Sequence, residues 1–106
     1  MAKYLFQANY VGKGVEGLRK DGGSKRREAA RAVLGSVGGT LESFYFAFGD
    51  VDAVGVVDMP DTASAAAASL IINASGMIAV KLTPLITVEE MDAAAGMQPS
   101  YRPPGT

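Results

Sequence analysis

The sequence contains no cysteine and no histidine. Without cysteine it forms no disulfide, no thiolate metal site and no cysteine nucleophile, and without histidine it has no imidazole for catalysis or metal binding. Any proton transfer would therefore use Asp, Glu, Lys or Tyr. No loop shows the ligand spacing of a carboxylate calcium site. We expect neither a metal nor a cofactor, and the residues leave open whether the protein is an enzyme.

A large net charge and a long apolar run are also absent. The formal net charge is −1, so no global field attracts nucleic acid or an anionic membrane. The apolar runs are far shorter than the roughly 20 residues that span a bilayer. Gln7 and Asn9 interrupt the N-terminal segment, which therefore lacks the apolar region of a signal peptide. We expect a cytoplasmic protein that binds neither nucleic acid nor membrane.

The composition that is present is that of one globular domain. Hydrophobic residues make up 48% and charged residues 20% of the 106 residues, which is enough apolar material for a single core. We expect residues 1–95 to form an α+β domain. Residues 96–106, which include Pro99, Pro103 and Pro104, are expected to form a Pro-rich C-terminal tail.

The periodicity of apolar residues predicts the order βαββαβ followed by a short helix. Alternation predicts four strands, at about residues 4–10, 40–48, 53–58 and 77–86. Helical spacing predicts a first helix in two pieces, broken at Gly22-Gly23, a second capped by Asp61, and a third capped by Thr87. Short connections and right-handed crossovers then favour a ferredoxin-like fold, with an antiparallel sheet in the order 4-1-3-2 and the helices on one face.

The pleat of the strands sorts their residues into two faces. One face is nearly all apolar, and we expect the helices to cover it: Tyr4, Phe6, Ala8, Phe44, Phe46, Val54, Val56, Ile78, Val80 and Leu82. The other face is mixed: Leu5, Gln7, Asn9, Ser43, Tyr45, Ala53, Gly55, Val57, Ala79, Lys81 and Thr83. On the second helix, a stripe of mostly small residues is expected to approach the sheet: Ala63, Ala67, Leu70, Ile71 and Ala74.

Three interpretations of the mixed face remain open. It packs on another subunit, or it lines a pocket in which Asn9, Tyr45 and Lys81 converge on a ligand, or it is a partly wet surface. Thr83 lies on the same face, and Asp52 is a candidate at the rim of such a pocket, as a base or a cation ligand. The alternative for Asp52 is structural: in the turn Gly49-Asp50-Val51-Asp52, Gly49 supplies a positive φ and Asp bonds neighbouring amides.

The basic residues are concentrated in the first helix. Residues 13–31 hold seven basic and three acidic side chains. Ser24, Lys25 and Arg26 follow Gly22-Gly23 and open the second helical piece, where free amide groups and cations can hold an anion. A solvated helix face is the alternative. The segment is not a P-loop, because the Gly-x-x-x-x-Gly-Lys spacing of that motif is absent.

Several segments together resemble the GYD-domain family, over about residues 3–92. They are Asn9-Tyr10 with Gly14, Ser24-Lys25-Arg26-Arg27, Gly38-Gly39, Phe44-Tyr45, Gly49-Asp50-Val51-Asp52 and Met59-Pro60-Asp61. Val51 stands where the family has Tyr, so a role of that Tyr does not carry over. The resemblance implies a ferredoxin-like domain that associates as in dimeric α+β barrels, and it implies no activity.

We interpret the chain as a homo-oligomeric domain, a homodimer or larger, that is structural or binds a small molecule. The mixed face would be buried between copies, with Leu5 and Val57 in the interface and the tail clasping the neighbour. The alternative, which rests on fold analogy, is a cofactorless enzyme resembling monooxygenases or isomerases. In that enzyme Tyr45 and Asn9 would orient the substrate and Lys81 would stabilise an oxyanion.

Overall fold

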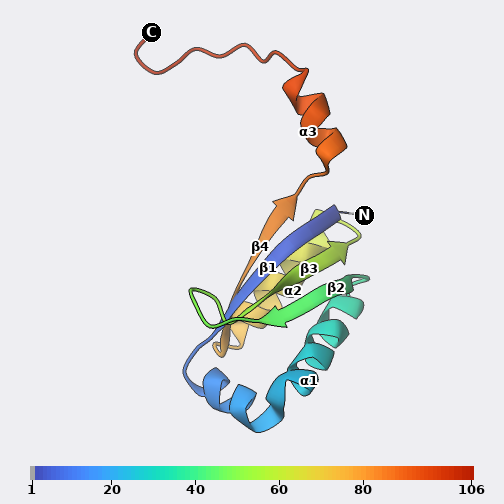
Figure 1. Ribbon diagram of the computed structural model, residues 1–106, viewed down its shortest axis with the longest axis vertical. Helices are drawn as coiled ribbons and strands as arrows, with labels where there is room; N and C mark the ends of the chain where they lie inside the picture. The colour runs from blue at the N-terminus through green and yellow to red at the C-terminus, as the bar shows by residue number, and fades with distance from the viewer. Residues whose placement is uncertain (1) are drawn as a thin grey trace.

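The computed structural model describes residues 2–106 and has an α+β architecture (Figure 1). Its elements follow one another in the predicted order, which the structure confirms. They are β1 (Ala2–Tyr10), α1 (Lys13–Gly35), β2 (Thr40–Phe46), β3 (Ala53–Met59), α2 (Thr62–Ala74), β4 (Ile78–Leu85) and α3 (Val88–Ala95).

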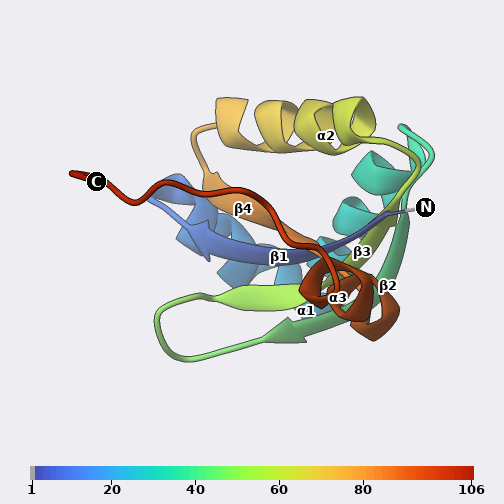
Figure 2. The same cartoon turned by 90° about the horizontal axis from the view of Figure 1, so that it is seen from above.

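The four strands form one antiparallel sheet in the order β2-β3-β1-β4, which confirms the predicted topology. The two long helices lie on the same side of this sheet: α1 packs mainly on β2, and α2 packs mainly on β4 (Figure 2). The fold is therefore ferredoxin-like. The opposite side, which we call the open face, carries no helix from the body of the domain.

Helix α1 is bent at a glycine, as the sequence predicted. Gly22 has φ 77° and ψ 174°, a non-helical conformation in which an L-residue with a side chain is strained. The chain turns here and resumes as a second helical piece. The bend changes the direction of the basic segment that follows it.

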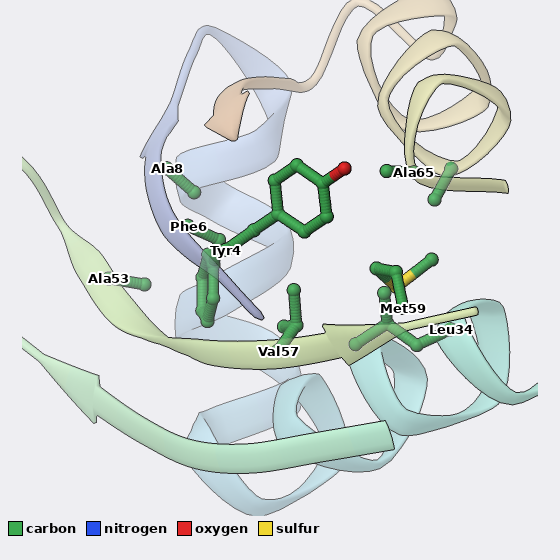
Figure 3. Packing of buried hydrophobic residues seen from close by; sticks show 9 residues of the cluster. Tyr4, Phe6, Ala8, Leu34, Ala53, Val57, Met59 and Ala65 are labelled. Atoms are coloured by element: carbon green, nitrogen blue, oxygen red, sulfur yellow. The ribbon is translucent and has the colours of Figure 1, made fainter. Parts of the chain in front are cut away.

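The core lies between the sheet and the two helices (Figure 3). Its buried residues are Tyr4, Phe6, Ala8, Leu34, Ala53, Val57, Met59, Ala65 and Ala68. The predicted face was right for β1 and β2 but wrong for β3. Ala53 and Val57 point into the core, whereas Val54 and Val56 lie on the open face, only partly buried.

The reason for the reversed phase of β3 is the size of its neighbours. Gly55 pairs with Phe6 on one side and with Phe44 on the other. The two rings meet over this strand with centroids 5.5 Å apart. A Cβ at position 55 would lie 2.6 Å from the Phe6 ring and 2.1 Å from the Ser43 carbonyl oxygen. The Phe6 ring and the Ser43 carbonyl group therefore leave room only for glycine on the core side, and the valines take the other side.

The predicted orientation of α2 is also wrong. Ala65 and Ala68 face the sheet, while Leu70 and Ile71 are 72% and 63% exposed. The helix has no charged residue to mark its solvent side, so the sequence pattern did not fix its rotation. Asn73 fixes it instead: its Oδ1 accepts the Val80 N–H at 2.8 Å, and its Nδ2 donates to the Val80 carbonyl at 3.3 Å.

The loop between β2 and β3 is wider than the predicted turn. Strand β2 ends at Phe46, and Gly49 is not among the glycines with a positive φ, so that prediction is wrong. The Ala47 N–H donates to the Asp52 carbonyl and the Asp52 N–H donates to the Ala8 carbonyl, each at 2.9 Å. With six residues between the strands, these bonds close the loop without a left-handed residue at its tip.

The C-terminal arm, which we define as residues 86–106, stands apart from the body (Figure 1). Thr87 caps α3 as predicted, through a reciprocal pair of hydrogen bonds with Glu90. No residue of α3 is buried, although the arm carries several large apolar side chains: Ile86, Val88, Met91, Met97 and Tyr101. The arm helps to give the molecule its longest extent, 55 Å.

We predict that Gly55→Ala lowers the free energy of unfolding by about 1–3 kcal/mol, because the added methyl group would collide with the Ser43 carbonyl group and the Phe6 ring. Urea denaturation of the two proteins measures the difference. Gly49→Ala is the matched control, since no atom lies within 4 Å of a Cβ there. Equal losses in the two variants would contradict the role assigned to Gly55.

A second prediction concerns the N-cap of α2. The Ser64 N–H donates to Asp61 Oδ1 at 2.7 Å, and this bond lowers the pKa of Asp61 below its ordinary value of 3.8. The pKa of Asp61 is therefore lower in the folded protein than in the unfolded chain. The stabilisation from the cap is fully present above the unfolded pKa and is lost as the pH falls through the folded pKa.

Asp61→Asn keeps a capping oxygen but removes this titration. The variant should lose less stability than the parent between about pH 5 and about pH 2, measured by urea denaturation. Asp50→Asn, in the exposed loop, removes one carboxylate in the same way and is the control for the change in net charge. An unchanged slope in Asp61→Asn would count against the cap.

Candidate functional site

The predicted ligand residues of the mixed face do lie on the open face, but in different strands. Asn9 is in β1, Tyr45 is in β2, and Lys81 and Thr83 are in β4. The register places Tyr45, Val54, Gln7 and Lys81 in one row across the sheet. Neighbouring strands are about 4.8 Å apart, so Tyr45 and Lys81, on opposite edge strands, have backbones roughly 14 Å apart. One chain does not bring them together.

The centre of the open face is apolar. Leu5, Val54 and Val56 lie on the two central strands and are only partly buried. Tyr45 beside them is 67% exposed. Lys81 and Thr83 flank this centre on β4 and are exposed to solvent. The surface thus combines an apolar middle with hydrogen-bonding groups at its margin.

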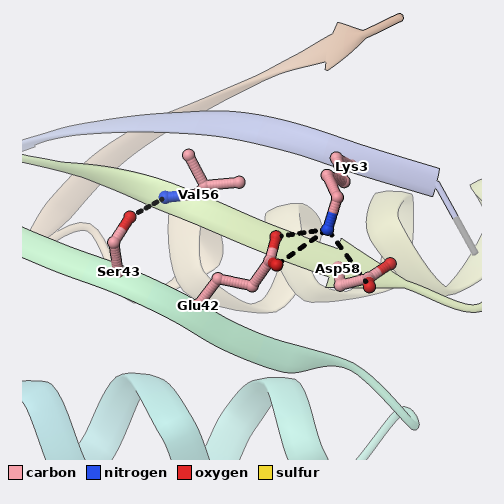
Figure 4. Close-up of polar contacts among 5 residues, drawn as sticks. All are labelled: Lys3, Glu42, Ser43, Val56 and Asp58. Carbon is pink, nitrogen blue, oxygen red and sulfur yellow. Dashed lines mark hydrogen bonds and ion pairs between the residues drawn. The ribbon is translucent and has the colours of Figure 1, made fainter. Parts of the chain in front are cut away.

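A charged cluster closes one end of the open face (Figure 4). Lys3 Nζ donates to both carboxylate oxygens of Glu42 at 2.7 Å and lies 3.6 Å from Asp58 Oδ2. The hydrogen bond to Glu42 is the main cause that raises the pKa of Lys3. A register shift between Leu41 and Ser43 makes Glu42 the extra residue of β2.

Sequence reasoning missed this cluster. The pairing of Lys3 with Asp58 follows from the register of β1 and β3, so a register prediction would have found that contact. The position of Glu42 depends on the bulge, for which the sequence holds no clear signal. The Ser43 hydroxyl supports the irregular segment by accepting the Val56 N–H at 3.1 Å (Figure 4).

Asp52 has a structural contact in this molecule. Its Oδ2 accepts the N–H of Tyr10 at 2.9 Å, which ties the end of β1 to the β2–β3 loop. The carboxylate thus bonds an amide 42 positions away, whereas the structural interpretation of the turn expected it to bond its own neighbours. The role of Asp52 as a base or ligand stays a prediction.

The three candidate anion-binding residues point in different directions. Ser24 and Lys25 are exposed, whereas Arg26 is half-buried and places its guanidinium 5.9 Å from the centre of the Tyr10 ring. Other arginines of α1 form surface ion pairs with Glu16 or Glu28, which contribute little to stability. The structure therefore separates Arg26 from the neighbours with which the sequence grouped it.

Within residues 2–106, no three acidic side chains come close enough to hold a metal ion. No helix of that same range is long and apolar enough to cross a membrane. The open face has an apolar middle and hydrogen-bonding groups at its margin.

The architecture and the bare sheet face define the class of this protein: a ferredoxin-like α+β domain with a surface available for contact. The family model described as GYD domain matches residues 4–95. The chain therefore belongs to the GYD domain family, which confirms the resemblance seen in the sequence. No curated protein matches the chain. No solved structure matches it either.

We predict that Asp52→Ala lowers the free energy of unfolding by about 1–3 kcal/mol, because it leaves the Tyr10 N–H without its acceptor. Thermal and urea denaturation measure the loss. Asp50→Ala removes a carboxylate from the same loop, with no hydrogen bond of its side chain recorded within residues 2–106, and should leave stability nearly unchanged. A neutral Asp52→Ala would mean that the bond contributes nothing.

Proposed function

We propose that this chain is a non-enzymatic domain that assembles with copies of itself through the open face and holds a small molecule there. The observation that supports the proposal is the bareness of that face: α1 and α2 both lie on the other side of the sheet. A cytoplasmic location, expected from composition, is part of the proposal.

Association is favoured by the apolar centre of the face. Covering Leu5, Val54 and Val56 gains about 25 cal/mol for each Å² of apolar surface removed from water, before the cost of association. A two-fold symmetric dimer uses one patch twice and is the commonest arrangement. The charged cluster around Lys3 would then lie toward the rim, where its charges keep contact with water.

The C-terminal arm supports the same proposal. It carries large apolar residues, among them Val88, Met91 and Met97, that find no core in their own chain. A neighbouring copy supplies the surface that these residues lack. The arm would reach across and cover part of the neighbour, so that association and burial of the arm occur together.

A second copy would also supply further candidate ligand residues to the same interface. Tyr45 and Lys81 occupy opposite edges of one sheet, but a symmetric partner adds another of each to the same interface. A small molecule between the two sheets would meet aromatic and apolar surface in the middle, and Asn9, Lys81 and Thr83 at the margin. These groups suit a compact ligand that accepts hydrogen bonds.

Sedimentation velocity tests the assembly. The parent should be a dimer or larger at micromolar concentration, and Leu5→Asp should give a folded monomer, because it puts a charge in the apolar centre. Val15→Asp, at an exposed position of α1, is the matched control and should keep the parent's size. Val57, which the sequence placed in the interface, is 1% exposed and belongs to the core, so that expectation is wrong.

A parent that sediments as a monomer would overturn the proposal. Native mass spectrometry of freshly purified protein examines the ligand separately. A co-purifying small molecule that Leu5→Asp releases would support a site between the sheets, and a bare oligomer would leave only the structural role.

A further inference from the structure

A crevice lies on the helix side of the sheet, away from the open face. Helix α1 packs mainly on β2 and α2 mainly on β4, and no comparable contact joins the two helices within residues 2–106. The space between them over the central strands is a cavity of about 90 Å³. Its walls are almost entirely apolar and include Phe6, Ala30, Val33, Phe44, Ile72 and Val80.

Arg26 is the only charged residue among those that line this cavity in the described part of the chain. Its Nε is buried and has no hydrogen-bond partner in residues 2–106. Its guanidinium lies over the Tyr10 ring, 5.9 Å from the ring centre, which holds the side chain at the mouth of the crevice. A buried N–H without an acceptor costs about 1–3 kcal/mol, so this position favours a molecule that supplies one.

A second cavity of about 240 Å³ adjoins the first and shares Tyr10, Arg26 and Ile78 with it. Asp21 also lines this second space, but it forms no ion pair with Arg26. Arg26 therefore lines both the apolar chamber and the second cavity. A ligand with an apolar part and an acidic head fits this order of groups.

We propose that the crevice binds a small amphipathic monocarboxylic acid, with its hydrocarbon part between α1 and α2 and its carboxylate on Arg26. Carboxylates pair with guanidinium groups through strong, charge-assisted hydrogen bonds, and the pair supplies the acceptor that Nε lacks. An apolar cavity of about 150 Å³ holds benzene, so the smaller chamber of about 90 Å³ suits a short aliphatic chain of about four carbons. The site is independent of the open face and of the assembly proposed there.

Isothermal titration calorimetry with pentanoate and 1-pentanol tests the head group. We expect pentanoate to bind about tenfold more tightly than 1-pentanol, since both have the same chain length and only one has a carboxylate. Arg26→Gln should abolish this preference. Lys25→Gln makes the same change in net charge at an exposed neighbour and should retain it. Arg26→Lys, which keeps the charge but not the planar fork, should retain only part of it.

Two alanines of α1 test the chamber. Ala30→Phe fills the space from a lining position and should weaken both ligands about tenfold, whereas Ala32→Phe, at an exposed position of the same helix, should leave both unchanged. Methyl NMR locates the ligand: pentanoate should shift the methyl signals of Val33 and Ile72, which line the crevice, and not those of Val54 and Val56 on the open face.

Equal affinity for pentanoate and 1-pentanol, or an unchanged preference in Arg26→Gln, would overturn the assignment of Arg26. Shifts confined to Val54 and Val56 would place the ligand on the open face and overturn the crevice site, while leaving the proposed assembly intact. The result of Leu5→Asp sedimentation does not bear on the crevice, so failure of one proposal is distinguishable from failure of the other.

Discussion

The packing of Phe6 and Phe44 across Gly55 decides which side of β3 faces the core. The rings belong to strands that are not neighbours, and they meet only because the strand between them carries no side chain at that point. This requirement fixes which residues of β3 face the helices. It turns Ala53 and Val57 into the core and leaves Val54 and Val56 on the open face, which becomes the apolar centre of the proposed interface.

Local signals in the sequence were sufficient for the elements and their order. Asp61 and Thr87 cap the helices for which they were proposed, and Gly22 bends α1 where the sequence placed a break. Local signals did not predict which side of β3 or which side of α2 faces the core. For β3 the answer depends on the size of side chains on neighbouring strands. Helix α2 has no charged residue to mark its solvent side, and the Asn73–Val80 hydrogen bonds set its rotation.

The candidate site shows the same division. Alternation in β1, β2 and β4 placed Asn9, Tyr45 and Lys81 correctly on the open face, because each strand shows a clear contrast between its two sides. Adjacency in the sequence was a poor guide to the basic segment. Successive helical residues point about 100° apart, so Arg26 is half-buried while its neighbour Lys25 is exposed to solvent. The place of Glu42 in the charged cluster around Lys3 could not be predicted, because it depends on a bulge for which the sequence holds no clear signal.

The open face and the crevice have a common origin in the placement of the helices. Because α1 lies mainly over β2 and α2 mainly over β4, neither helix lies directly over the two central strands, β1 and β3. The side chains of these strands that point to the helices line the crevice. Those that point the other way form the apolar centre of the open face. Residues adjacent in β1 therefore serve different surfaces: Phe6 lines the crevice and Leu5 lies on the open face. Burial of the open face against a second copy would add packing to strands that now have it on one side only, and it would make the floor of the crevice more rigid.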